Sequence, residues 1–234
     1  MVQVFEKNLK YYKSEDYIEA NARTEFIDKF LMIFNWDVKN ENNVAPKYKE
    51  VILDAKTNVT GRAKHPDYSL CIGGNPVLYV EAKPPSVKIL NADSYALQLR
   101  KYGYSNHKNL SILTDFEEFA VYDCRKKPKD DDTADKARIK YITLDNYINE
   151  FDYLWDVFSY DAVIKGSIDT FFDKTNGNYV SNDVNDEILE AINEWRMLLI
   201  KSVESKKEIT PKNINMAVQR LINRIVFIWR SKGY

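Results

Sequence analysis

The pattern of apolar and polar positions changes its period once along the chain. Over the first 145 residues, short apolar or alternating runs bounded by Gly, Pro and Asn predict β-strands. The predicted strands are residues 48–53, 68–72, 76–80, 110–113, 118–122 and 138–144, the last of them an edge strand. Beyond residue 145, apolar residues recur every three or four positions, which indicates helices. The pattern therefore predicts a sheet-containing domain over residues 1–145 and an all-α connector over residues 146–234.

Two helices are predicted among the strands. In the first helix, Phe30 and Phe34 recur at helical spacing with other apolar residues. Ser14 is suited to capping its start, and Asn35 tolerates the left-handed conformation that often ends a helix. A second helix is predicted over residues 92–104. This order of helices and strands is typical of a mixed sheet with helices on its faces, an α/β fold.

The composition fits a folded globular chain and bears on its cellular location and on the partners that it can bind. Apolar residues make up 44% of the 234 residues, and no run is long enough to span a membrane. The N-terminal segment lacks the apolar stretch of a signal peptide. Cys71 and Cys124 lie in apolar runs and are expected to be reduced core thiols, so a cytoplasmic location is expected. The net charge of −1 argues against a strongly basic nucleic-acid coat but leaves local basic patches open.

Two acids and a lysine bracket the strands at residues 68–72 and 76–80, which a Gly-Gly-Asn turn joins. The ends of a hairpin meet, so Asp67, before the first strand, comes beside Glu81, after the second. Glu81 and Lys83 are two residues apart, so their side chains leave the same face. Two carboxylates and an amine then converge on one spot. Such a pair of oxygen ligands suits Mg²⁺, which usually takes one or two carboxylates and keeps several waters.

The same residues fit a second interpretation, a hairpin with charged ends that are solvated and inert. Residues 77–80 argue against it, because they are apolar without alternation, as in a buried central strand. Acids and a lysine that end a buried strand need a reason, since unpaired buried charge costs free energy.

The PD and ExK pattern formed by these residues resembles the signature of the PD-(D/E)xK nuclease superfamily. Gln98 and Tyr102 resemble the QxxxY motif that follows this signature in Type I restriction motor subunits. Residues 22–38 and 113–123 are similar to segments of Type IIG restriction–modification enzymes. The resemblance implies a restriction-endonuclease-like fold and a Mg²⁺-dependent DNA endonuclease, the cleavage module of a Type IIG enzyme.

The resemblance also implies the roles of the central residues. The carboxylates of Asp67 and Glu81 and the main-chain carbonyl of Ala82 would bind Mg²⁺, for which Mn²⁺ is expected to substitute. Lys83 would align the attacking water and offset negative charge on the phosphate.

Three further residues are implied around this centre. Gln98 and Tyr102, four apart on one helix face, would point back at the site and support it. Glu25, on the first helix, would act as a further acidic group near the metal, through a water molecule. The alternative for Glu25 is a solvated helix acid, and for Gln98 and Tyr102 a half-buried helix face.

Basic residues near the site are candidates for contacts to DNA phosphates. They lie in the predicted loop of residues 56–64 and on the second helix, and they are Lys56, Arg62, Lys64, Arg100 and Lys101. Another charged stretch, residues 125–136, is expected to be a solvated loop. The single histidines, His65 and His107, are not expected to act as catalytic bases.

By resemblance, the substrate is double-stranded DNA, and the chain is similar to the front of an enzyme that continues into other domains. The chain has no Asn-Pro-Pro-Tyr tetrapeptide and no Gly-rich methyl-donor loop. Expected partners are methyltransferase and recognition domains in cis, and a second copy of the chain for double-strand cleavage. Two alternatives stay open: a DNA-binding module that does not cut on its own, and the nuclease portion of a Type I-like subunit.

The connector is expected to contribute no catalytic group. Its apolar stripes, with Phe227 and Trp229 beside the last of them, exceed what a small connector can bury. Large exposed apolar areas usually mark a partner surface. We therefore predict an attachment surface within residues 146–234.

Overall fold

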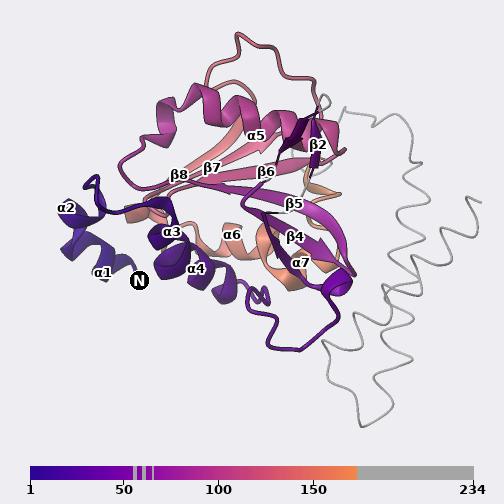
Figure 1. Ribbon diagram of the computed structural model, residues 1–234, viewed down its shortest axis with the longest axis horizontal. Helices are drawn as coiled ribbons and strands as arrows, with labels where there is room; N and C mark the ends of the chain where they lie inside the picture. The colour runs from indigo at the N-terminus through magenta and orange to yellow at the C-terminus, as the bar shows by residue number, and fades with distance from the viewer. Residues whose placement is uncertain (55–56, 60–61, 65, 173–234) are drawn as a thin grey trace, which may run out of the picture. The chain divides into compact units, whose positions relative to one another are not determined.

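In the computed structural model, six strands of the described residues form one mixed sheet in the order β1-β4-β5-β6-β7-β8 (Figure 1). Their bounds are β1 (Val51–Leu53), β4 (Tyr68–Ile72), β5 (Asn75–Ala82), β6 (Leu110–Thr114), β7 (Glu118–Asp123) and β8 (Arg138–Thr143). β5 and β6 run parallel, and the other neighbouring pairs are antiparallel. A parallel pair needs a crossover connection, and helix α5 (Asp93–Ser105) supplies it. The predicted mixed sheet is confirmed, with β8 at an edge.

The structure describes residues 1–54, 57–59, 62–64 and 66–172, and for the two three-residue segments it describes the backbone alone. The chain divides into two units, Met1–Tyr160 and Asp161–Tyr234. The sheet lies in the first unit. Most of the predicted connector, with Phe227 and Trp229, lies outside the described residues, so the attachment surface stays a prediction.

Helices cover both faces of the sheet (Figure 1). Besides α5, the helical segments are α1 (Val2–Lys7), α2 (Leu9–Tyr12), α3 (Glu19–Ala22), the π-helix η1 (Arg23–Ile27), α4 (Asp28–Ile33), the 3₁₀ turns η2 (Pro46–Tyr48), η3 (Ile89–Asn91) and η4 (Leu144–Asn146), α6 (Phe151–Phe158) and α7 (Tyr160–Ile164). On one face, Leu99 of α5 joins Tyr79 of β5 in a buried cluster. On the other, the ring of Phe30 in α4 lies 5.9 Å from that of Phe119 in β7. Because successive side chains of a strand point to opposite faces, the strands contribute to two separate apolar layers.

The first predicted helix differs from the structure at its start and agrees at its end. The predicted cap at Ser14 is wrong, because its hydroxyl donates to the carbonyl of Tyr11 and α3 begins only at Glu19. Serine hydroxyls can bond the preceding backbone as readily as they cap a following helix. Asn35 ends the helix with a positive φ of 63°, as predicted.

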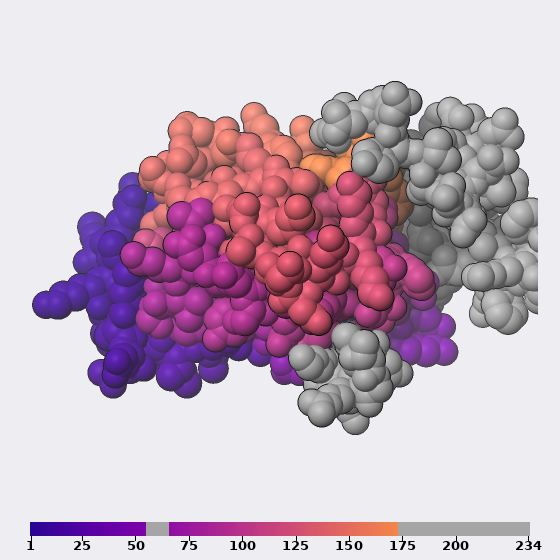
Figure 2. Space-filling model, turned by 90° about the horizontal axis from the view of Figure 1, so that it is seen from above, coloured from indigo at the N-terminus to yellow at the C-terminus, as the bar shows by residue number. Residues whose placement is uncertain are grey.

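Two segments predicted as loops are more ordered than the sequence indicated. Residues 56–64 include a short antiparallel hairpin of β2 (Thr57–Val59) and β3 (Arg62–Lys64), whose strands are too short for an alternating pattern to reveal. The charged stretch at residues 125–136 is mostly exposed (Figure 2), as expected of a solvated loop, although contacts hold it to β7 and to α5. Within it, the carbonyl of Ala134 accepts a hydrogen bond from the hydroxyl of Tyr122 on β7.

The described residues also bear on the predictions made for the two cysteines and for membrane-spanning segments. Cys71 and Cys124 are both buried and unpaired with each other, as expected of core thiols. Among the described residues, no helix combines the length and the apolar character needed to cross a membrane.

Candidate active site

Asp67, Glu81 and Lys83 lie together at the end of the β4–β5 hairpin. Tyr68 pairs with Val80, which sets Asp67 opposite Glu81. The ammonium nitrogen of Lys83 is 3.0 Å from Glu81 Oε1 and 3.9 Å from Asp67 Oδ2. One ammonium group therefore contacts both carboxylates, as the hairpin register predicts.

All three side chains are almost fully buried. The exposed fractions are 8% for Asp67, 4% for Glu81 and 7% for Lys83. Their burial follows from the position of β5 inside the sheet, between β4 and β6. Pairing continues past the end of the strand, since the Lys83 N–H donates to the carbonyl of Thr114 at 2.9 Å. The alternative of solvated hairpin ends does not describe this cluster.

The Lys83 ammonium lies where the three predicted metal-ligand oxygens converge. Besides the two carboxylates, it donates to the main-chain carbonyl of Ala82. Among the described residues, no group of three or more His, Cys, Asp and Glu side chains is arranged to hold a metal ion. A cation at this point would therefore depend on the Ala82 carbonyl and on water besides the two carboxylates, which is the kind of donor set that Mg²⁺ uses. The donors that are present fit a hard divalent cation.

The carboxylate oxygens of Asp67 and Glu81 have unequal partners. Asp67 Oδ2 accepts a hydrogen bond from the Ala82 N–H at 2.7 Å, and Asp67 Oδ1 faces Arg23 Nη1 at 3.4 Å. Glu81 Oε1 is contacted by Lys83, whereas Glu81 Oε2 is buried and has no hydrogen-bond partner among the described residues. A buried carboxylate oxygen without a donor costs free energy. Glu81 Oε2 is therefore the oxygen of the site that a cation would most stabilise.

Burial and the neighbouring charges shift the pKa of each group. Burial raises the pKa of Glu81 to about 7, although the Lys83 ammonium opposes the shift. Burial also raises the pKa of Asp67, against the lowering effect of the Ala82 N–H and of Lys83. Burial by itself lowers the pKa of Lys83, but the surrounding carboxylates outweigh it and the pKa is raised. The acids thus hold the lysine in its charged form.

Glu19, which the sequence analysis did not single out, is the helix acid that reaches the cluster. Its Oε2 lies 3.1 Å from the Lys83 ammonium. Glu25 is exposed and interacts with Tyr12 and Tyr17, whose pKa values it helps to raise after the larger effect of burial. Among the contacts of the described residues, none joins Glu25 to Asp67, Glu81 or Lys83. Both acids were predicted on one helix, so spacing alone could not choose between them.

The predicted face of α5 points at the site. Gln98 Nε2 donates to the Tyr102 hydroxyl at 2.6 Å and lies 3.5 Å from Glu81 Oε1. Burial, followed by the charge of Glu81, raises the pKa of Tyr102 to about 12. Tyr95, one turn earlier, has its ring centre 4.9 Å from the Lys83 ammonium, a cation–π contact. The helix therefore contributes both a hydrogen-bond chain and an aromatic wall.

The basic residues proposed to contact DNA lie in different surroundings. Arg100 is 3% exposed and pairs with Asp132 at 2.7 Å, so a phosphate contact would require this ion pair to open. Lys101 is exposed and pairs with Asp130 at 2.6 Å. The backbones of Arg62 and Lys64 lie on β3, while their side chains, and all of Lys56, lie outside the described part of the chain.

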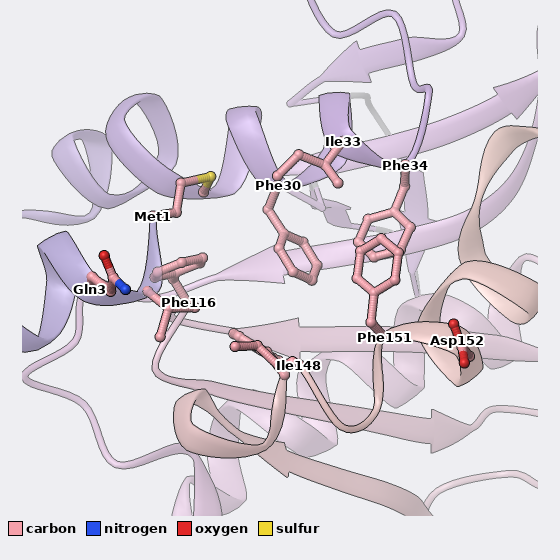
Figure 3. A pocket seen from close by; sticks show the side chains of 11 residues that line it. Met1, Gln3, Phe30, Ile33, Phe34, Phe116, Ile148, Phe151 and Asp152 are labelled. Atoms are coloured by element: carbon pink, nitrogen blue, oxygen red, sulfur yellow. The ribbon is translucent and has the colours of Figure 1, made fainter.

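An aromatic pocket of about 580 Å³ lies on the opposite face of the sheet from α5 (Figure 3). Figure 3 shows Phe30 from α4, Phe34 directly after this helix, Phe116 from the β6–β7 turn and Phe151 from the start of α6 around it. Asp152 is the acid among its lining residues. No lysine is among the residues that line this pocket, in contrast to the cluster at the end of β5.

A mixed sheet flanked by helices, with two acids and a lysine at the end of its central hairpin, defines a restriction-endonuclease-like fold. Residues 50–130 match the family model described as Type I restriction enzyme R protein N terminus. That match covers β4, β5, α5 and β6, the elements that build the site.

A longer similarity joins the chain to a curated protein. Over 231 residues it is 30% identical to the Type II restriction enzyme and methyltransferase RM.Eco57I of Escherichia coli. The alignment covers 97% of this chain and 23% of that protein, so the chain spans about a quarter of the length of this relative. No solved structure matches the chain. The two matches confirm the resemblance to the nuclease region of restriction enzymes.

Proposed function

We propose that this chain is a Mg²⁺-dependent endonuclease module that hydrolyses phosphodiester bonds of double-stranded DNA, as the cleavage part of a Type IIG restriction–modification enzyme. The observation that carries the proposal is the buried cluster of Asp67, Glu81 and Lys83 at the end of β5. Burying three charged groups in a largely apolar sheet costs free energy that their mutual pairing offsets only in part, and such clusters are typical of functional sites. The similarity to restriction enzymes supplies the class of reaction.

Each residue has a task that its position supports. Asp67, Glu81 and the Ala82 carbonyl would hold Mg²⁺, which when bound supplies Lewis acidity and favours a hydroxide nucleophile. Lys83 would orient the attacking water and stabilise the charge that develops on the phosphate. Gln98 would hold Glu81 in place through the contact between Gln98 Nε2 and Glu81 Oε1. Water forms a new P–O bond as the bond to the leaving oxygen breaks.

Glu19 enters the proposal as the acid that positions Lys83 from α3. The role of Glu25 as a water-mediated ligand stays a prediction. The wider partners are also proposed: methyltransferase and recognition domains on the same polypeptide, and a second copy for cutting both strands, in the cytoplasm of a prokaryote.

A cleavage assay on supercoiled plasmid tests the proposal. We expect Mg²⁺ or Mn²⁺ to be required, and Asp67→Asn and Glu81→Gln each to reduce nicking to background. Asp123→Asn is a matched control, because Asp123 has the same 8% exposure as Asp67 but pairs with Arg125 at 2.9 Å on β7. Metal-independent cutting would contradict the proposal. DNA binding without any cutting, in a fusion to the adjoining domains as well, would favour the non-cleaving module.

A further inference from the structure

Arg23 contacts Asp67, one of the two acids of the cluster, from outside the β4–β5 hairpin. One of its amino groups, Nη1, lies 3.4 Å from Asp67 Oδ1. The other, Nη2, donates to the main-chain carbonyl of Asp67 at 3.4 Å. The planar fork of the guanidinium thus spans the side chain and the backbone of a single residue, a geometry that a lysine ammonium cannot reproduce.

The two oxygens of the Asp67 carboxylate are consequently held from opposite elements. Oδ2 accepts from the Ala82 N–H at 2.7 Å, inside the hairpin, and Oδ1 faces Arg23 on η1. Neither contact comes from Lys83, which approaches Oδ2 only to 3.9 Å. With both oxygens fixed, rotation of this carboxylate is restrained before any ligand binds.

Arg23 is itself held in place. Its guanidinium carbon lies 5.0 Å from the centre of the Tyr68 ring, and the Tyr68 hydroxyl donates to Asp28 Oδ1 at 2.7 Å. Arg23 opens η1 and Asp28 directly follows it. The i→i+5 bonding of a π-turn sets such residues one turn apart, so both reach the same tyrosine. Single π-turns inside α-helices are frequent at functional sites.

The charge of Arg23 acts in the direction that a metal ligand needs. Its guanidinium is a cation 3.4 Å from Asp67 Oδ1, so it offsets part of the cost of burying the charge of this carboxylate. The outer partner of Arg23, Asp54, lies 3.3 Å from Nη1 but is largely exposed, so this pair is expected to contribute little. The inner contact with Asp67 is therefore the one with a consequence for the site.

We propose that Arg23 is a positioning residue, which fixes the carboxylate of Asp67 in the orientation that binds a divalent cation. This inference rests on the proposed function, because it assumes that Asp67 is a metal ligand. Partners that orient a ligating group typically contribute 10- to 100-fold to metal affinity. Arg23 would touch no reacting atom and would act only through the carboxylate of Asp67.

Titration calorimetry with Mn²⁺, without DNA, tests the inference apart from cleavage. We expect Arg23→Gln to weaken Mn²⁺ binding by about 10- to 100-fold, and Arg23→Lys, which keeps the charge but loses the fork, to fall between it and the unchanged protein. Raising the Mn²⁺ concentration should restore cleavage by Arg23→Gln. A merely structural defect would not be rescued in this way.

Two matched variants serve as controls. Asp54→Asn removes the exposed partner of Arg23 and should leave Mn²⁺ affinity unchanged. Arg138→Gln removes another arginine stacked on a tyrosine, 5.2 Å from the Tyr141 ring, which donates to the carbonyl of Leu90. It should also leave the affinity unchanged.

The outcomes separate the two proposals. Full Mn²⁺ affinity in folded Arg23→Gln, with tight binding by the unchanged protein, overturns the positioning role and leaves the nuclease proposal intact. An unchanged protein that binds no Mn²⁺ overturns both. If Arg23→Gln does not fold, Arg23→Lys decides, because full affinity in that variant shows that the fork is not needed.

Discussion

Two buried aspartates, Asp67 beside β4 and Asp115 beside β6, lie at the ends of the two strands that flank β5, in opposite surroundings. Asp67 has Arg23 and Lys83 within reach and a backbone N–H on its second oxygen. Asp115 is fully buried, and its Oδ1 accepts from the Glu118 N–H at 2.6 Å, but its Oδ2 has no hydrogen-bond partner. Among the described residues, no ion pair includes Asp115. Burial raises the pKa of both, and only Asp67 has cations that oppose the shift.

The contrast extends to the residues beside each acid. Glu81 and Lys83 accompany Asp67 on the α5 face of the sheet. Phe116 follows Asp115 in the β6–β7 turn, with a positive φ of 76°, and enters the aromatic layer on the other face. A bulky residue in that conformation is strained and must be held by its packing. A buried acid alone, even with a backbone donor, therefore does not indicate a candidate site, whereas an acid on which cations converge does.

The largest expected effect is a loss of stability when an aromatic ring is removed from the face of the sheet opposite α5. Phe116 is 2% exposed, and its ring lies 4.7 Å from Phe26 and 5.4 Å from Phe5. We expect Phe116→Ala to lower the free energy of unfolding by about 3–5 kcal/mol, measured by urea denaturation. Phe151→Ala, at a ring that is 40% exposed at the same pocket, should cost clearly less. Equal costs would show that strain relief at Phe116 offsets its packing.

The next effect concerns the charged face, where the fold should persist although loss of the buried ammonium leaves Asp67 and Glu81 without their shared partner and lowers stability. We expect Lys83→Ala to slow DNA cleavage by about 10²- to 10³-fold, because a positioned cation stabilises the transition-state charge. Metal binding should persist in this variant, since the carboxylates provide it. Lys140→Ala, which removes a lysine paired with Glu150 at 2.8 Å and stacked on the ring of Tyr153, is the matched control. Near-normal cleavage by Lys83→Ala would mean that another group orients the water.

A smaller effect separates the two helix acids. Glu19 contacts Lys83, whereas Glu25 interacts with Tyr12 and Tyr17. We expect Glu19→Gln to reduce cleavage about tenfold, the lower range for a partner that orients a functional group. Glu25→Gln should leave it unchanged. The reverse result in a plasmid nicking assay would restore the water-mediated role predicted for Glu25.

The smallest predicted effect is a stabilisation: removing the buried charge of Asp115 should raise the melting temperature. Because burial raises the pKa of Asp115 in the folded state, its stability contribution is fully present below the unfolded value of 3.8 and is lost as pH rises towards the folded pKa. Asp115→Asn keeps the oxygen that accepts from Glu118 and removes the charge. We expect its melting temperature at neutral pH to rise by about 2–4 °C, which about 1 kcal/mol gives in a chain of this size.

The pH dependence provides the control for this last prediction. At pH 3 the carboxyl of Asp115 is protonated in both folded and unfolded chains, so the advantage of Asp115→Asn should vanish. A stabilisation of equal size at pH 3 and pH 7 would show that charge is not its cause.

The sheet, the hairpin and the central residues of the candidate site can all be predicted from the order of residues along the chain. Asp67, Glu81 and Lys83 come together because pairing between adjacent strands is local, and alternation then fixes which side chains share a face. Gln98 and Tyr102 follow from helical spacing in the same way. These features need only short-range geometry, so a single sequence is sufficient to predict them.

Only the tertiary structure decided which distant groups join that core. Glu19 reaches Lys83 across 64 positions of the chain and Arg23 reaches Asp67 across 44. The pairing of Arg100 with Asp132, which withdraws a predicted DNA contact into the interior, likewise depends on a loop folding back over α5. Such contacts depend on how whole elements pack, and the packing is set by apolar burial that has no direction of its own. No periodicity in the sequence encodes them.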